Sequence, residues 1–183
     1  MLSFMAGCVT AGGKVPKTTL AESTAENQSK PTLSYYSNYL GSYRPHESNS
    51  SLQVAQELLE ELHKSQYFKE ITRGDSRETD IQLNVSLEII GSNQGVENAR
   101  AFSGQTIFLI PLWGTDHYQV TAQVKNKNGL RKEYVVNDSA TGIFWLPLVV
   151  FLPFTYDREE YVRTNMSRNI IQKMYEDGFI EEN

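Results

Sequence analysis

Strict alternation of apolar and polar residues over positions 80–89 constrains the fold of this chain more than any other feature. Ile81, Leu83, Val85, Leu87 and Ile89 alternate with polar side chains, which is the pattern of a strand with one buried face. Such a strand needs partner strands and a second layer that covers its apolar face. Because the 183 residues include a single cysteine, that layer must be held by a hydrophobic core and not by intramolecular disulfides.

The helix nearer the N-terminus is predicted from about Ser51 to Ser65. Ser50 followed by Gln53 forms a capping box, and leucines recur behind it at helical spacing. Three glutamates occupy the other side and are interpreted as a solvated face: Glu57, Glu60 and Glu61.

A second helix is predicted close to the C-terminus. Asp157 with Glu160 suits its first turn, and Gly178 suits its end as residue C′. Its methionines lie at core spacing and are interpreted as filling the core and not as ligands. The apolar stripe consists of Val162, Met166, Ile170, Ile171 and Met174.

A β-hairpin is predicted around Asn128-Gly129. A three-residue loop from Lys127 to Gly129 places Val120 opposite Val136, so that both apolar sets lie on one face, whereas a two-residue loop would separate them. Gly129 would then adopt the left-handed conformation of a G1 bulge. With a tyrosine-rich strand from Leu33 to Tyr43, these elements predict one α+β domain over residues 33–183. We expect an antiparallel sheet of about four strands with two helices packed on one face.

Cys8 is the residue most informative about location. It follows Met5-Ala6-Gly7, and small residues directly before a cysteine near the start of a chain are typical of the bacterial lipoprotein signal. Acyl chains on that cysteine would anchor the protein to a membrane. Residues 1–8 are therefore interpreted as a signal remnant with its anchor cysteine, and residues 9–32 as a flexible polar tether. The alternative is an ordinary thiol in a cytosolic tail.

Two apolar runs, residues 107–113 and 143–154, stand out in an otherwise polar chain. One interpretation is that they are buried strand ends and core-facing loops. The other is an exposed patch that docks on lipid or on a partner protein, with the tryptophans at the interface. The candidate contact residues of that patch are Trp113, Trp145, Leu146, Phe151 and Phe154.

Composition and motifs exclude several function classes. The net charge of −5 argues against nucleic acid as a partner, because phosphate binding needs a basic face. No nucleophile elbow, phosphate-binding glycine loop or zinc motif is present, so no cofactor or metal is expected. Asp116-His117 is the single place where an acidic residue directly precedes a histidine, and a hydrolase using this pair is the enzymatic alternative.

The Met-Ala-Gly-Cys motif and the order of the elements that follow it resemble small Gram-negative outer-membrane lipoproteins. The resemblance implies a lipid-anchored protein at the periplasmic face of the outer membrane, and Val9 after the cysteine suits that destination. It also implies an accessory or assembly role without a catalytic site. We therefore expect a non-enzymatic protein that binds or scaffolds another envelope component, with a cytosolic interaction domain as a further alternative.

Overall fold

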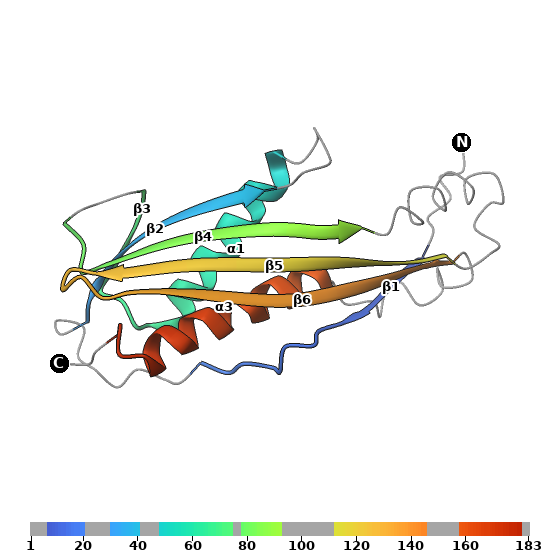
Figure 1. The fold of residues 1–183 in the computed structure, drawn as a ribbon. Coiled ribbons are helices and arrows are strands. Elements are labelled where there is room, and N and C mark those ends of the chain that lie inside the picture. The colour runs from blue at the N-terminus through green and yellow to red at the C-terminus, as the bar shows by residue number, and fades with distance from the viewer. Residues whose placement is uncertain are drawn as a thin grey trace. The chain divides into compact units, whose positions relative to one another are not determined.

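The computed structural model describes residues 7–20, 30–40, 48–74, 78–92, 112–145 and 158–180. These residues form six strands and two helices (Figure 1). The strands are β1 (Gly7–Gly12), β2 (Thr32–Leu40), β3 (Glu70–Arg73), β4 (Ile81–Ser92), β5 (Leu112–Asn126) and β6 (Arg131–Trp145); the helices are α1 (Ser48–Ser65) and α3 (Arg158–Glu176).

The strands form one sheet in the order β1-β6-β5-β4-β2-β3. The predicted α+β class with two helices is confirmed, but the prediction of about four antiparallel strands is corrected in two respects. The sheet has six strands within the described residues, and it is mixed, because β2 pairs in parallel with both β3 and β4. Parallel neighbours need a crossover connection, which α1 supplies between β2 and β3.

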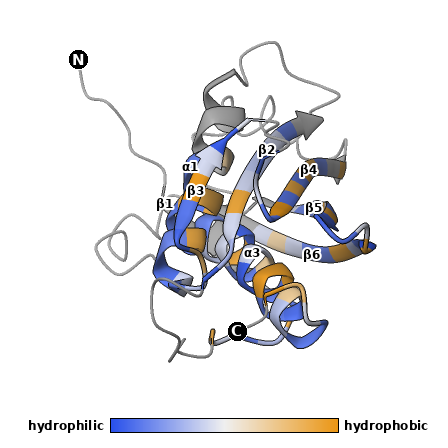
Figure 2. Cartoon of the chain, turned by 90° about the vertical axis from the view of Figure 1, so that its left-hand side faces the viewer, coloured by the Kyte–Doolittle hydropathy of each residue, from blue (hydrophilic) through white to orange (hydrophobic). Residues whose placement is uncertain are grey.

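The chain divides into two compact units, and each strand from β4 to β6 contributes to both. One unit comprises residues 1–14, 89–118 and 138–162 and contains β1. The other comprises residues 15–88, 119–137 and 163–183 and contains α1, β2, β3 and most of α3. In this second unit α1 packs against β2, and hydrophobic residues lie along both helices and the strands (Figure 2).

The core follows the predicted periodicities. Along β4 the alternate side chains of Ile81, Leu83, Val85 and Leu87 are at most 5% exposed, while Asn84 between them is exposed. The predicted stripe of α3 is wholly buried, and its two methionines are part of the core: Val162, Met166, Ile170, Ile171 and Met174 are 0% exposed.

The predicted hairpin register is confirmed. The N–H of Asn126 donates to the carbonyl of Leu130 at 3.0 Å, which makes residues 127–129 the three-residue loop. Gly129 has a φ of 86°, as a G1 bulge requires. In the same register Gln123 lies opposite Glu133, and its Nε2 donates to the Glu133 carboxylate at 2.9 Å.

The helix ends agree with the sequence in one case and differ in the other. At the end of α3, Gly178 has a φ of 73°, and the N–H of Phe179 donates to the Met174 carbonyl, which completes a Schellman motif. The predicted capping box on α1 is wrong in position, because the helix begins at Ser48 and Ser50 is already within it. Asp157, the predicted cap of α3, lies outside the described residues.

The structure describes part of the predicted tether of residues 9–32, as far as Leu20. β1 pairs with β6, Cys8 being the register partner of Phe144. Further along, the side-chain amide of Asn165, 1% exposed, donates to the carbonyls of Val15 and Pro16 and accepts from the Thr18 N–H at 2.8 Å. Residues 21–29 lie outside the described residues.

Candidate functional site

The predicted contact residues are only partly covered by the structure. Trp113 lies in β5 and Trp145 in β6, so each apolar run overlaps a strand. Leu146, Phe151 and Phe154 lie outside the described residues. An exposed apolar patch therefore stays a prediction.

The predicted acid–histidine pair does not converge in space. Asp116 and His117 are consecutive residues of β5, and successive side chains of a strand point to opposite faces of the sheet. His117 is exposed, whereas Asp116 is half-buried. The geometry therefore gives His117 no orienting carboxylate from its neighbour, as a general base would need.

The interpretation of the α1 glutamates as a solvated face is wrong for two of the three. The carboxylate of Glu57 accepts from Nε and Nη2 of Arg163 at 2.8 and 2.9 Å. Glu61, 1% exposed, accepts from Nε of Arg168 at 2.5 Å. Both arginines belong to α3, more than 100 residues later, so the pattern within α1 could not reveal these pairs. These ion pairs link α1 to α3.

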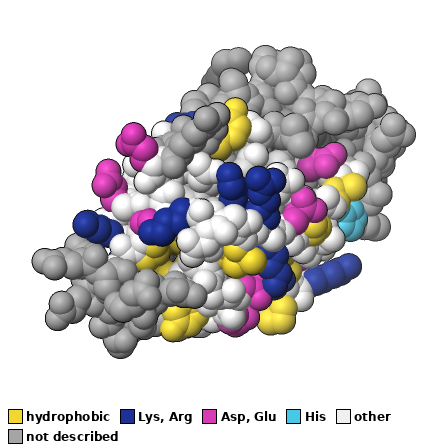
Figure 3. Space-filling model, turned by 60° about the vertical axis from the view of Figure 1, so that its left-hand side comes forward, with side chains coloured by type: hydrophobic (Ala, Val, Ile, Leu, Met, Phe, Trp, Pro, Cys, Tyr) yellow, Lys and Arg dark blue, Asp and Glu magenta, His cyan; other side chains and the backbone are white. Residues whose placement is uncertain are grey.

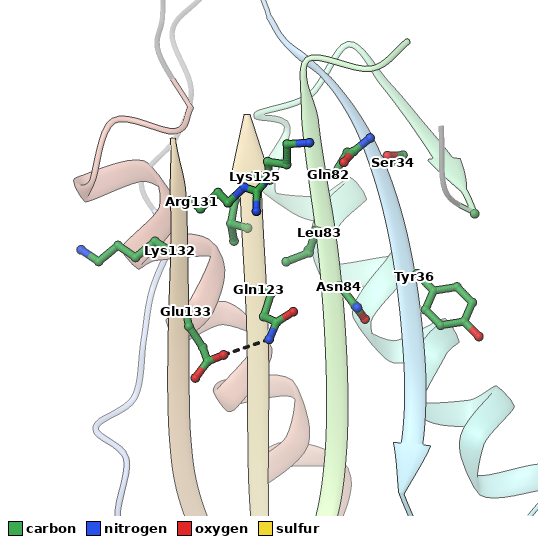
Figure 4. A pocket seen from close by; sticks show the side chains of 12 residues that line it. Ser34, Tyr36, Gln82, Leu83, Asn84, Gln123, Lys125, Arg131, Lys132 and Glu133 are labelled. Carbon is green, nitrogen blue, oxygen red and sulfur yellow. Dashed lines mark hydrogen bonds between the residues drawn. The ribbon is translucent and has the colours of Figure 1, made fainter. Parts of the chain in front are cut away.

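A pocket of about 750 Å³ lies on the polar side of the sheet, and sequence reasoning missed it (Figure 4). Residues of β2, β4, β5 and β6 line it, among them Tyr36, Gln82, Asn84, Gln123, Lys125 and Arg131. Its size falls in the range of small-molecule sites. Its lining is rich in amide, hydroxyl and charged groups, which suits a polar ligand.

Two cations stand directly opposite each other in this pocket. The hairpin register that pairs Asn126 with Leu130 also pairs Lys125 with Arg131, and both are exposed. Within the part of the chain that the structure describes, neither has an ion-pair partner. Figure 3 shows Lys and Arg side chains interspersed with Asp and Glu side chains on the face in view. Like charges directly opposite on paired strands are destabilising, so this arrangement has a cost for the fold.

The other two charged residues that line the pocket each have a polar partner, a neutral amide for Glu133 and a carboxylate for Lys132. Glu133 accepts from Gln123, and Nζ of Lys132 lies 2.6 Å from the Asp177 carboxylate. In Figure 4 the Lys132 side chain points away from the amide side chains. The exposed positive charge at the pocket is therefore that of Lys125 and Arg131.

Asp80, the residue before β4 begins, connects three segments of the chain. Its carboxylate accepts from Nζ of Lys127 at 2.6 Å and from the N–H and hydroxyl of Thr32 at 2.9 and 2.8 Å. These hydrogen bonds outweigh partial burial and lower the pKa of Asp80 from 3.8 to about 2. The start of β2, the start of β4 and the hairpin turn are thereby held in register.

The described residues bring no three metal-ligating side chains together. Within the same residues, neither helix combines the length and apolar composition needed to cross a bilayer.

No protein-family model and no curated protein sequence matches this chain. Among solved structures, a PelC dodecamer from Paraburkholderia phytofirmans is 10% identical, over 90% of this chain and 96% of that one, with a TM-score of 0.43. A DUF330 protein from Xanthomonas campestris is 9% identical, over 88% of this chain and 94% of that one, with a TM-score of 0.48. A minor lipoprotein from Acinetobacter baumannii is 9% identical, over 80% and 88%, with a TM-score of 0.30. All three are distant likenesses.

Proposed function

We propose that this chain is a lipid-anchored, non-enzymatic protein at the periplasmic face of the Gram-negative outer membrane, where it binds or scaffolds another envelope component. The observation that carries the proposal is the sequence Met5-Ala6-Gly7-Cys8. Two or three acyl chains on Cys8, at about 0.8 kcal/mol per buried CH₂, would make the attachment permanent on the timescale of the cell.

The position of Cys8 in the fold adds a spatial argument. A coil over residues 9–32 would hold the domain roughly 25–30 Å from the headgroups. With β1 formed, the distance between the headgroups and the domain is much shorter, because Gly7–Gly12 are already part of the sheet. The unit that contains β1 would therefore lie directly against the lipid surface.

The same pairing supports a role for the apolar runs. Cys8, the first residue of the proposed mature chain, is the register partner of Phe144, and Trp145 is the next residue of β6. An acylated Cys8 would thus bring the end of β6 to the membrane interface, where tryptophan is a favoured residue. Trp113 and Trp145, with Leu146, Phe151 and Phe154, form the proposed contact surface for lipid or for an envelope protein.

The experiment is intact mass analysis with membrane fractionation in a Gram-negative host, with the chain expressed from its chromosomal upstream region. Wild type should yield a mature species that begins at acylated Cys8 and fractionates with the outer membrane. A Cys8→Ser variant should yield an unprocessed species that does not. An unprocessed wild-type product in the soluble fraction would contradict the proposal and favour a cytosolic interaction domain.

A further inference from the structure

We propose that the pocket on the polar side of the sheet binds a small polyhydroxylated ligand that carries a phosphate monoester, with Lys125 and Arg131 as the phosphate-binding residues. The inference uses none of the residues proposed for membrane attachment and does not depend on acylation of Cys8.

Charge matching points to the phosphate. Lys125 and Arg131 face each other across β5 and β6 and together carry two positive charges without an ion-pair partner among the described residues. A phosphate monoester carries close to two negative charges at pH 7, whereas a carboxylate or a phosphate diester carries one. The guanidinium fork of Arg131 can bind two phosphate oxygens at once, and the Lys125 ammonium adds a point charge.

The remaining side chains indicate the rest of the ligand. Gln82, Asn84 and Gln123 present amide groups beside the cations, and Tyr36, which is 50% exposed, lies at the β2 side of the pocket (Figure 4). Amides both donate and accept hydrogen bonds, which suits the hydroxyl groups of a polyol or sugar. The pocket volume of about 750 Å³ leaves room for such a body next to the phosphate.

The repulsion between Lys125 and Arg131 supports a binding role for this pair. The chain as a whole has a net charge of −5, yet two cations are placed directly opposite each other on neighbouring strands. An anion bound between them would convert this repulsion into attraction. Glu133 lies on the same face as a counteracting charge, which is partly satisfied by Gln123.

The test is isothermal titration calorimetry of the full-length chain with glucose 6-phosphate, glucose and inorganic phosphate as probes. Glucose 6-phosphate should bind saturably with one site, inorganic phosphate more weakly, and glucose not measurably. Replacement of both Lys125→Gln and Arg131→Gln should weaken glucose 6-phosphate binding about tenfold or more, because two charged hydrogen-bond donors are lost. Glu133→Gln should strengthen it severalfold.

Lys69→Gln is the matched control, since it removes one exposed cation outside the pocket and should leave the affinity unchanged. Relief of the like-charge contact should leave the thermal midpoint of the double variant equal to or above that of wild type, so a loss of binding cannot be ascribed to unfolding. An equal loss in Lys69→Gln would overturn the site in favour of unspecific charge attraction.

The ligand's own titration gives a second readout. The second pKa of a phosphate monoester is about 6, so affinity should fall as the pH drops below that value. The charged residues that line the site are Lys125, Arg131, Glu133 and Lys132, and the Lys132 ammonium is paired with Asp177. No histidine is among the described lining residues, so a change near pH 6 reports the ligand. Binding to phosphatidylglycerol vesicles but not to glucose 6-phosphate would overturn the proposal in favour of a phospholipid.

Discussion

Arg168 on α3 donates from Nε to the carboxylate of Glu61 on α1 at 2.5 Å, although the Glu61 side chain is only 2% exposed. Burial alone would raise the pKa of Glu61, but hydrogen bonds from Arg168 and Lys64 outweigh it and hold the pKa below its usual value. Glu61 is thus a buried charged residue, and the hydrogen bonds from Arg168 and Lys64 keep its carboxylate ionised.

Removal of the buried partner should therefore destabilise the fold. Arg168→Gln leaves Glu61 with Lys64 as its remaining cation and should lower the free energy of unfolding by about 2–3 kcal/mol, measured by urea denaturation. Lys64→Gln is the control: the Lys64 side chain is 59% exposed, and the loss should stay below about 1 kcal/mol. Equal losses in the two variants would contradict a special role for the Arg168 pair.

Stability should decline in acid because of Asp80 as well as Glu61. The pKa of Asp80 is about 2 in the folded protein and 3.8 as its ordinary value. Its contribution is present above the unfolded pKa and is lost as the pH falls from about 4 towards 2. In urea denaturation, the difference in stability between wild type and Asp80→Asn should be largest at pH 6 and shrink at pH 2.5. A difference that does not vary with pH would rule out this ionic contribution.

The N-terminal segment should detach when Asn165 is truncated. Asn165→Ala removes three hydrogen bonds to Val15, Pro16 and Thr18, and should cost about 2–4 kcal/mol. Hydrogen exchange at the Thr18 amide should accelerate in the same variant. Asn169→Ala removes one longer bond, 3.4 Å to the Thr18 hydroxyl, and should leave that amide protected. Unchanged exchange in Asn165→Ala would show that other contacts hold the segment.

Substitution of Gly129 tests the hairpin turn. Nothing lies within 4 Å of a Cβ built at this position, so Gly129→Ala should cost only the backbone strain of a φ of 86°, about 1 kcal/mol. Gly129→Asn should cost less, because asparagine tolerates the left-handed region. Thermal denaturation measures both. A larger loss for Asn than for Ala would be inconsistent with strain as the cause.

Tryptophan fluorescence should report the proposed membrane contact without background. The chain has two tryptophans, Trp113 and Trp145, and both belong to the unit that contains β1. In vesicles of brominated phosphatidylcholine, the acylated protein should be quenched more strongly than the Cys8→Ser variant. If quenching of the acylated protein were as weak as that of the Cys8→Ser variant, the tryptophans would lie away from the lipid even if mass analysis shows acylation.

Local patterns predicted the parts of the fold that depend on local information. The alternation from Ile81 to Leu87 and the loop at Gly129 define their own strand and turn, and the stripe from Val162 to Met174 defines its own helix face. Each of these signals lies within about 15 consecutive residues.

Pairings between distant segments were not accessible in the same way. β1 consists of small residues that carry no period, and its partner β6 lies far along the chain. The glutamates of α1 look solvated until Arg163 and Arg168 are placed beside them. The pair of Lys125 and Arg131, by contrast, follows from the hairpin register and could have been found from the sequence.

The pairing of β1 with β6 also sets the order in which the fold can form. Gly12 can pair with Ala140, and Gly7 with Trp145, only after those partner residues have been synthesised. The first strand therefore finds its partner only after most of the chain has been made. Contacts of such large sequence separation form slowly, because a long loop must close before they stabilise anything. During that interval residues 7–12 have no strand partner, and Cys8 is accessible to any enzyme that processes an N-terminal cysteine.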